Sequence, residues 1–147
     1  MAASESAING AAYYVELSSD GGTTWLKLGE LTNCSFEASH ETRETTDKFS
    51  DGNAEFAEGK KSATMSGEGN VAFASESGFA KPNDLFGFLN NRTKLDARMS
   101  TANAGDFQWG GKAYVNSFSM GAGNEGENAT YSVGLQMSGA ILNDVVV

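Results

Sequence analysis

The chain has 147 residues and a formal net charge of −9, with 18 glycines, one proline and one cysteine. Its length predicts one domain with its own core. Neutralising phosphates takes clustered basic side chains, and the ten Lys and Arg residues here are scattered, so a nucleic-acid binder is disfavoured. A single cysteine excludes an internal disulfide. The sequence shows no secretory signal and no apolar run of membrane-spanning length, so we expect folding in a reducing cytoplasm without membrane anchoring.

The amino-terminal third predicts an arm, a hairpin and a strand. Residues 1–11 lack any pattern and are expected to form a flexible arm. Strands at 12–18 and 23–29 flank Ser-Asp-Gly-Gly, which predicts a hairpin because glycine supplies the positive φ of a tight turn. A further strand is expected at 34–38.

Residues 40–61 are polar and carry both signs of charge, with Phe49 and Phe56 as their only large apolar residues. We predict a long loop here. Connections of this length in a compact domain are usually functional or disordered.

The rest of the chain predicts four strands and one helix. Alternation of apolar and polar residues predicts strands at 62–73, 93–100, 112–120 and 129–140. A short helix is expected at about 83–91, with Pro82 leading in and Asn83 or Asp84 as its cap. Residues 140–147 are expected to form an apolar tail. The fold class is mainly β with one helix.

The strand at 129–140 has two unlike faces. Ala129, Tyr131, Val133, Leu135 and Met137 alternate toward one side and predict a core face. The other face, together with that of 62–70, contains one acid and no base; its residues are Ser62, Thr64, Ser66, Glu68, Asn70, Thr130, Ser132, Gly134, Gln136 and Ser138.

This polar face contrasts with Lys94, Asp96 and Arg98, whose alternating charges predict a solvated outer face. The plain interpretation is that the uncharged face simply meets water or lies under a loop. However, residues 129–140 also lack the Lys, Pro or inward charges that protect sheet edges. The segment is therefore either a central strand or an edge that pairs with another chain.

Several residues are candidates for chemistry, but none makes a convincing site. "SSDGGTTW" (18–25) fits the Asp-box of sialidases; a single copy instead favours a hairpin brace in which Asp20 bonds the turn backbone. His40 is the only histidine, and no nucleophile-elbow pattern surrounds any serine. Cys34 is interpreted as a core residue. We expect no catalytic residue, cofactor or metal site.

Two blocks carry a family resemblance. Residues 44–73, "ETTDKFSDGNAEFAEGKKSATMSGEGNVAF", combine a Thr-rich start, a Lys-x-Ser-x-Gly turn and an alternating strand. Residues 107–141, "FQWGGKAYVNSFSMGAGNEGENATYSVGLQMSGAI", combine an aromatic-bearing strand, a Gly/Glu-rich hairpin and a strand closing on Ser-Gly. In order and spacing they resemble the major tail protein, or tail tube protein, of long-tailed bacteriophages. That family is related to the tube proteins of contractile tails and type VI secretion. The "SSDGGTTW" hairpin departs from its pattern.

The resemblance implies a β-sandwich or barrel-like subunit with one flanking helix. Six copies would join edge to edge into a ring with a continuous inner barrel. Stacked rings would form a virion tube through which DNA passes without specific binding. Assembly would take place in the host bacterial cytoplasm. The partners would be the chain itself and the tail tip or baseplate, tape measure and terminator proteins.

The resemblance also suggests roles for particular residues. The uncharged face would line the lumen through Ser62, Thr64, Ser66, Glu68, Asn70, Thr130, Ser132, Gln136 and Ser138. The segment from 45 to 61 would reach the adjacent ring through Thr45, Thr46, Asp47, Lys48, Asp51, Glu55, Lys60 and Lys61. The terminal segments 1–11 and 140–147 would contact neighbours too.

Two other classes of function remain open from the residues alone. A carbohydrate-binding β-sandwich is favoured by the Asp-box and by the aromatic residues Trp25, Trp109, Tyr13 and Tyr14. A small hydrolase is disfavoured because groups that titrate near neutral pH are scarce.

Overall fold

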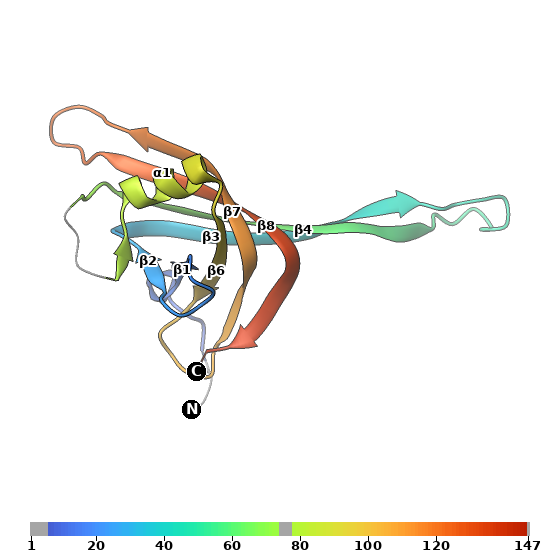
Figure 1. Cartoon of the computed structure of the whole chain (residues 1–147). Coiled ribbons are helices and arrows are strands. Elements are labelled where there is room, and N and C mark those ends of the chain that lie inside the picture. Colours follow the sequence, from blue (N-terminus) through green and yellow to red (C-terminus); the bar gives the residue numbers. More distant parts are fainter. Residues whose placement is uncertain (1–5, 74–77, 147) are drawn as a thin grey trace.

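The structure, a computed structural model, describes residues 6–73 and 78–146. These residues form one eight-stranded sheet with the strand order β3-β4-β8-β7-β6-β1-β2-β5 (Figure 1). The elements are a 3-10 turn at Gly10–Ala12, β1 (Tyr14–Ser18), β2 (Leu26–Leu28), β3 (Leu31–Glu44), β4 (Phe56–Asn70), β5 (Phe79–Ala80), α1 (Pro82–Asn91), β6 (Lys94–Ser100), β7 (Phe107–Gly121) and β8 (Thr130–Val145). The expected mainly β fold with one helix is confirmed, as is the hairpin of β1 and β2.

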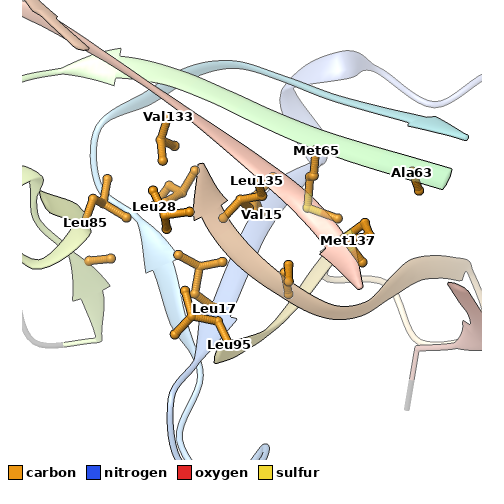
Figure 2. Packing of buried hydrophobic residues seen from close by; sticks show 14 of the residues in the cluster. Val15, Leu17, Leu28, Ala63, Met65, Leu85, Leu95, Val133, Leu135 and Met137 are labelled. Atoms are coloured by element: carbon orange, nitrogen blue, oxygen red, sulfur yellow. The ribbon is translucent and has the colours of Figure 1, made fainter. Parts of the chain in front are cut away.

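The core lies where the curved sheet folds back toward its own β1–β2 end, beneath α1 (Figure 1). Figure 2 shows Val133 and Leu135 of β8 gathered with Val15 of β1 and with Leu85 of α1. In β8 every second side chain from Tyr131 to Met137 is buried, as the period-two pattern predicts. Burying such side chains contributes roughly 1.5–3 kcal/mol each and fixes which face of β8 points inward.

Helix α1 covers one side of this core. Its first turn is held by the Asp84 carboxylate, which accepts a hydrogen bond from the Lys81 N–H at 3.2 Å. The helix ends at Asn91, and the following residue, Arg92, adopts left-handed geometry with φ 54°. Leu85 points into the core, and the Phe86 ring meets Phe118 of β7 at a centroid distance of 6.2 Å. The helix therefore packs against residues 116–121 of β7.

Tyr131 links β8 to the β2–β3 turn. Its ring is buried, and its hydroxyl donates a hydrogen bond to the carbonyl oxygen of Gly29. Burial, with a smaller contribution from Glu30, raises the pKa of Tyr131 to about 12. The folded state thus favours the protonated phenol. The stabilisation is fully present below the ordinary tyrosine pKa near 10 and is lost as pH rises toward 12.

We predict that Tyr131→Phe lowers the free energy of unfolding at pH 7 by about 1 kcal/mol, the typical net value of one hydrogen bond. The variant should also lose less stability than the wild type between pH 10 and 12. Urea unfolding at both pH values measures the two effects. The matched control is Tyr114→Phe, because Tyr114 lies on the opposite, exposed side of the sheet. Equal behaviour of the two variants would contradict the role given to the Tyr131 hydroxyl.

Residues 40–61 differ from the expected loop. β3 continues to Glu44 and β4 begins at Phe56, with His40 opposite Lys61 and Glu44 opposite Phe56. Only 45–55 is irregular. This hairpin, the arm, projects far beyond the body of the subunit (Figure 1). The amino-acid sequence does not alternate here, because the arm's strands bury almost nothing on either face. Their pairing depends on backbone hydrogen bonds.

The two chain ends also differ from the expectations. Residues 141–145 are not a separate tail, because β8 continues through them and pairs with Phe107–Gly111 of β7. The Val146 N–H then donates to the Asp106 carbonyl at 2.7 Å. At the other end, Asn9 caps the 3-10 turn through Ala11 N–H. Residues 1–5 of the expected arm and residue 147 lie outside the described residues.

Candidate lumen face and assembly surfaces

The register of β4 and β8 brings the nine predicted lumen residues onto one face. Thr64 lies opposite Gln136, Glu68 opposite Ser132, and Asn70 opposite Thr130. Directly paired residues point to the same side of a sheet. That side faces away from the core, since Ala63, Met65, Gly67 and Gly69 of β4 alternate with it and are buried. The structure therefore forms the continuous polar surface that the two strands predicted separately; its role as a lumen stays a prediction.

Two more strands extend this face. Ser35 of β3 and Ser66 of β4 share a hydrogen bond of 2.6 Å, and Ser119 of β7 and Ser132 of β8 share one of 2.7 Å. The Gln136 amide donates to the Ala63 carbonyl at 3.2 Å. Many polar groups of the face are thus bonded to one another or to the backbone. We name this surface, contributed by β3, β4, β8 and the 116–121 half of β7, the polar face.

The contributions of β3 and β7 to the polar face were not predicted from the amino-acid sequence. The signal in β3 was present, because Asn33, Ser35, Glu37 and Ser39 alternate with Cys34, Phe36 and Ala38. Only the strand order shows that this alternation continues the surface of β4.

The polar face carries acid but no base across its four strands. Glu37 and Glu68 are its carboxylates, and the stretches 31–39, 62–70, 113–121 and 130–138 contain no Lys or Arg. A surface of this kind attracts no polyanion, because phosphate binding depends on ion pairs with cations.

The expected contrast with Lys94, Asp96 and Arg98 was wrong in one respect. Tyr114 pairs with both Lys94 and Gln136, so β6 continues the same side of the sheet rather than an opposite one. The reason is that the strands within 6–73 and 78–146 form a single sheet, not two.

The charges of β6 are largely held by local partners. Lys112 binds Asp96 at 2.7 Å, and Arg98 binds Glu16 at 3.2 Å. The Arg98 guanidinium also lies over the Trp25 ring, 3.9 Å from its centroid. These interactions compensate the charges of Lys112 and Arg98 at the border of the polar face.

The pairing of the strands shows which edges of the polar face lack a neighbouring strand. β8 is a central strand, because β4 and β7 pair with its two sides. Within the described residues β3 pairs with β4 alone, and residues 116–121 of β7 pair with β8 alone. The polar face therefore has two free margins, β3 and residues 116–121 of β7. Unpaired N–H and C=O groups at such margins are templates for pairing with another chain.

The arm presents the predicted inter-ring residues away from the body. Thr45, Thr46, Asp47, Lys48, Asp51 and Glu55 lie in the tip, and Lys60 and Lys61 lie in β4; all are exposed.

The arm tip, residues 45–55, is internally bonded. The Thr45 N–H donates to the Glu55 carbonyl at 2.7 Å, and Asp47 accepts the Phe49 N–H at 2.8 Å. The Phe49 side chain is nevertheless 81% exposed, and Phe56 is 61% exposed. Phe49 in the tip and Phe56 at the start of β4 thus place two exposed aromatic rings at the far end of the arm, which indicates a contact surface.

The remaining candidate residues have structural roles. Asp20 accepts hydrogen bonds from the Thr24 N–H at 2.9 Å and the Ser18 hydroxyl at 2.7 Å, and these bonds lower its pKa. The Asp-box is therefore a hairpin brace. Burial raises the pKa of the half-buried Cys34 thiol, which makes it a weak nucleophile. His40 is exposed at the base of the arm.

Neither a metal cluster nor a membrane span is found in the part of the chain that the structure describes. Its His, Cys, Asp and Glu residues form no group of three that could hold a metal ion. No helix within 6–73 and 78–146 is long and apolar enough to cross a membrane.

Comparison with known proteins identifies the family. The family model described as "Phage tail tube protein" matches residues 7–143. The chain belongs to this family of structural virion tail proteins, which is not a family of enzymes. The resemblance found in the sequence is thereby confirmed. No curated protein matches the sequence.

Solved structures share the fold at low sequence identity. The tail of an empty gene transfer agent (GTA) particle, refined with C6 symmetry, superposes with a TM-score of 0.75 at 19% identity, covering 94% of this chain and 99% of that chain. The SPP1 tail tube gives a TM-score of 0.70 at 16% identity, covering 96% and 81%. The sheath–tube complex of an extracellular contractile injection system, PVC, gives 0.69 at 18%, covering 97% and 94%.

Proposed function

We propose that the chain is the subunit of a tail tube that assembles as stacked hexameric rings and conducts DNA. The observation that carries the proposal is the polar face: four strands wide, without bases, and bounded by two unpaired margins. Family membership and the C6 symmetry stated for the GTA tail support a six-subunit ring.

Ring closure would use the two free margins. β3 of one copy would pair with residues 116–121 of β7 in the next, which joins different surfaces of the two copies. A head-to-tail contact of this kind generates a ring when its rotation closes. The polar faces would then form one continuous inner wall lined by the nine predicted residues.

The negative charge of the proposed ring would let DNA move through it without sticking to the wall. Six copies at −9 carry about −54 formal charges. A wall without Lys or Arg forms no phosphate ion pairs, and the surrounding negative field repels DNA from it. DNA would therefore pass without specific binding.

The arm would connect one ring to the next, because its tip is the part of the chain that projects farthest and exposes aromatic rings. The terminal segments 1–11 and 140–147 would add contacts between neighbouring subunits. The tape measure protein would be a further partner of the tube. The tail tip or baseplate and the terminator would bind its two ends. Assembly would take place in the host cytoplasm, and the product would be part of the virion tail.

Electron microscopy of the purified protein tests this proposal. We expect negatively stained six-subunit rings and tubes with a central channel, formed by the protein alone or after it is added to isolated tail tips. Light scattering gives the accompanying particle mass. Protein that stays monomeric under both conditions would contradict self-assembly.

A further inference from the structure

A groove opens at the end of β3 that is remote from the arm. It has a volume of about 660 Å³ and is lined by Gly10, Ala11, Tyr13 and Tyr14 and by parts of β2, β3, β5 and β6. Apart from the buried Leu28, its large apolar side chains are only half-buried, so the groove exposes hydrocarbon to water. The half-buried apolar and aromatic residues that line it are Tyr13, Leu31, Cys34, Phe79 and Met99.

Two charges of opposite sign flank this lining. Glu30 is exposed and adopts a left-handed backbone with φ 49°, which turns the chain at the start of β3. Lys27 lies with its Nζ atom 4.5 Å from the centroid of the Tyr14 ring. The groove therefore combines an apolar, aromatic-lined floor with one acid and one base.

The arm tip carries the complementary features. Phe49 is the large apolar side chain that the tip exposes most. Lys48 precedes it, with its Nζ atom 5.2 Å from the centroid of the ring, and Asp51 follows it. The base and the acid beside the Phe49 ring are therefore opposite in charge to Glu30 and Lys27, which flank the groove.

A subunit cannot fill its own groove with its own arm. β3 runs from Leu31, in the groove, to Glu44, where the tip begins. At about 3.3 Å per residue this strand separates groove and tip by roughly 40 Å. In Figure 1 the arm extends away from the body and does not fold back. The occupant must come from elsewhere.

We infer that the groove receives the arm tip of a second copy of this chain, with Phe49 among Tyr13, Leu31 and Phe79 and with Lys48 facing Glu30. Tip and groove lie at opposite ends of one strand, so the contact is head-to-tail. Translation along the strand direction repeats it without closing, which produces a stack and not a ring. The inference rests on the proposed function, because it names the receiving surface for the inter-ring arm.

The lone cysteine provides a direct test. Cys34 lines the groove, and Phe49→Cys adds a second thiol at the tip. Tubes of this variant, oxidised with copper phenanthroline, are run on a denaturing gel without reductant. Each copy both gives and receives a tip, so we expect a ladder that continues well beyond dimers. Adding Cys34→Ser to the same variant should reduce the ladder to dimers at most.

The matched control places the new thiol on another candidate occupant. Ser6 is exposed near the amino terminus, so Ser6→Cys tests whether that segment fills the groove. A ladder from Ser6→Cys and none from Phe49→Cys would overturn the inference. Normal tubes of Phe49→Cys without a ladder would overturn it as well, while leaving the proposed tube function intact. Failure of the unaltered chain to assemble would overturn both.

Charge reversal decides the matter if Phe49→Cys itself prevents stacking. Lys48→Glu and Glu30→Lys should each raise the protein concentration needed for tube formation at least about fivefold, the effect expected of about 1 kcal/mol at each contact. The two changes together should restore the wild-type concentration. Sedimentation of tubes over a dilution series measures all four proteins. Additive losses in the double variant would contradict a contact between the two residues.

Discussion

Replacing the arm by a two-residue turn should leave a folded subunit that forms rings but no tubes. Ser39 and Ser62 are paired, so residues 40–61 can be replaced by Asn-Gly, which favours the tight turn of a two-residue hairpin. The arm adds little to the core, since nearly all of its side chains are exposed. We therefore expect the free energy of unfolding to change by no more than about 1 kcal/mol.

Stacking should fail completely because the change removes the whole surface that would reach the next ring. Thermal unfolding checks the fold, and negative-stain microscopy with light scattering distinguishes single rings from tubes. A control with the whole tip retained but His40→Ala introduced at the exposed base of the arm leaves Lys48, Phe49 and Asp51 in place. It should stack with at most a modest rise in the required concentration. Tubes of normal length from the armless chain would place the inter-ring contacts elsewhere.

The parts of the fold that the sequence predicted are those where burial produces a pattern. Tyr131, Val133, Leu135 and Met137 had to alternate, because one face of β8 meets the core and the other does not. The helix was predicted because its apolar residues repeat at helical spacing next to a proline. In both cases a local pattern reflects a local difference in burial.

The arm and the end of β8 could not be predicted in this way. The arm's side chains are exposed on both faces, so its strands show no period. Residues 141–145 pair with the first part of β7, which lies thirty or more positions earlier in the chain. Pairing of this kind depends on which strands the topology places side by side, and no short stretch of sequence specifies it.

The extent of the polar face also depends on strand order, which the amino-acid sequence did not predict. Each strand's polar side was readable, but the order in which the sides join was not. Tyr114 connects Lys94 to Gln136 in one row, although the charged pattern of β6 suggested a separate outer surface. The lack of bases thus holds for the four strands of the polar face and ends at its border with β6.

Introducing a lysine into the polar face should slow the passage of DNA. Ser132 lies in the middle of this face, opposite Glu68 and Ser119. Ser132→Lys would place six cations on every ring of the proposed lumen, repeated along the whole tube. Each cation that meets a phosphate releases a counterion, so the energies add along the DNA. We expect DNA release from particles carrying the variant to slow by at least about tenfold.

Salt and position distinguish this mechanism from damage to the tube. Phosphate contacts weaken steeply with ionic strength, so higher salt should restore the release rate of Ser132→Lys. Ser132→Gln adds length without charge and should release DNA normally. Asn90→Lys adds the same charge at an exposed position of α1 and should also release normally. If Ser132→Lys released DNA as fast as Asn90→Lys, the polar face would not line the channel, and the lack of bases on it would need another cause.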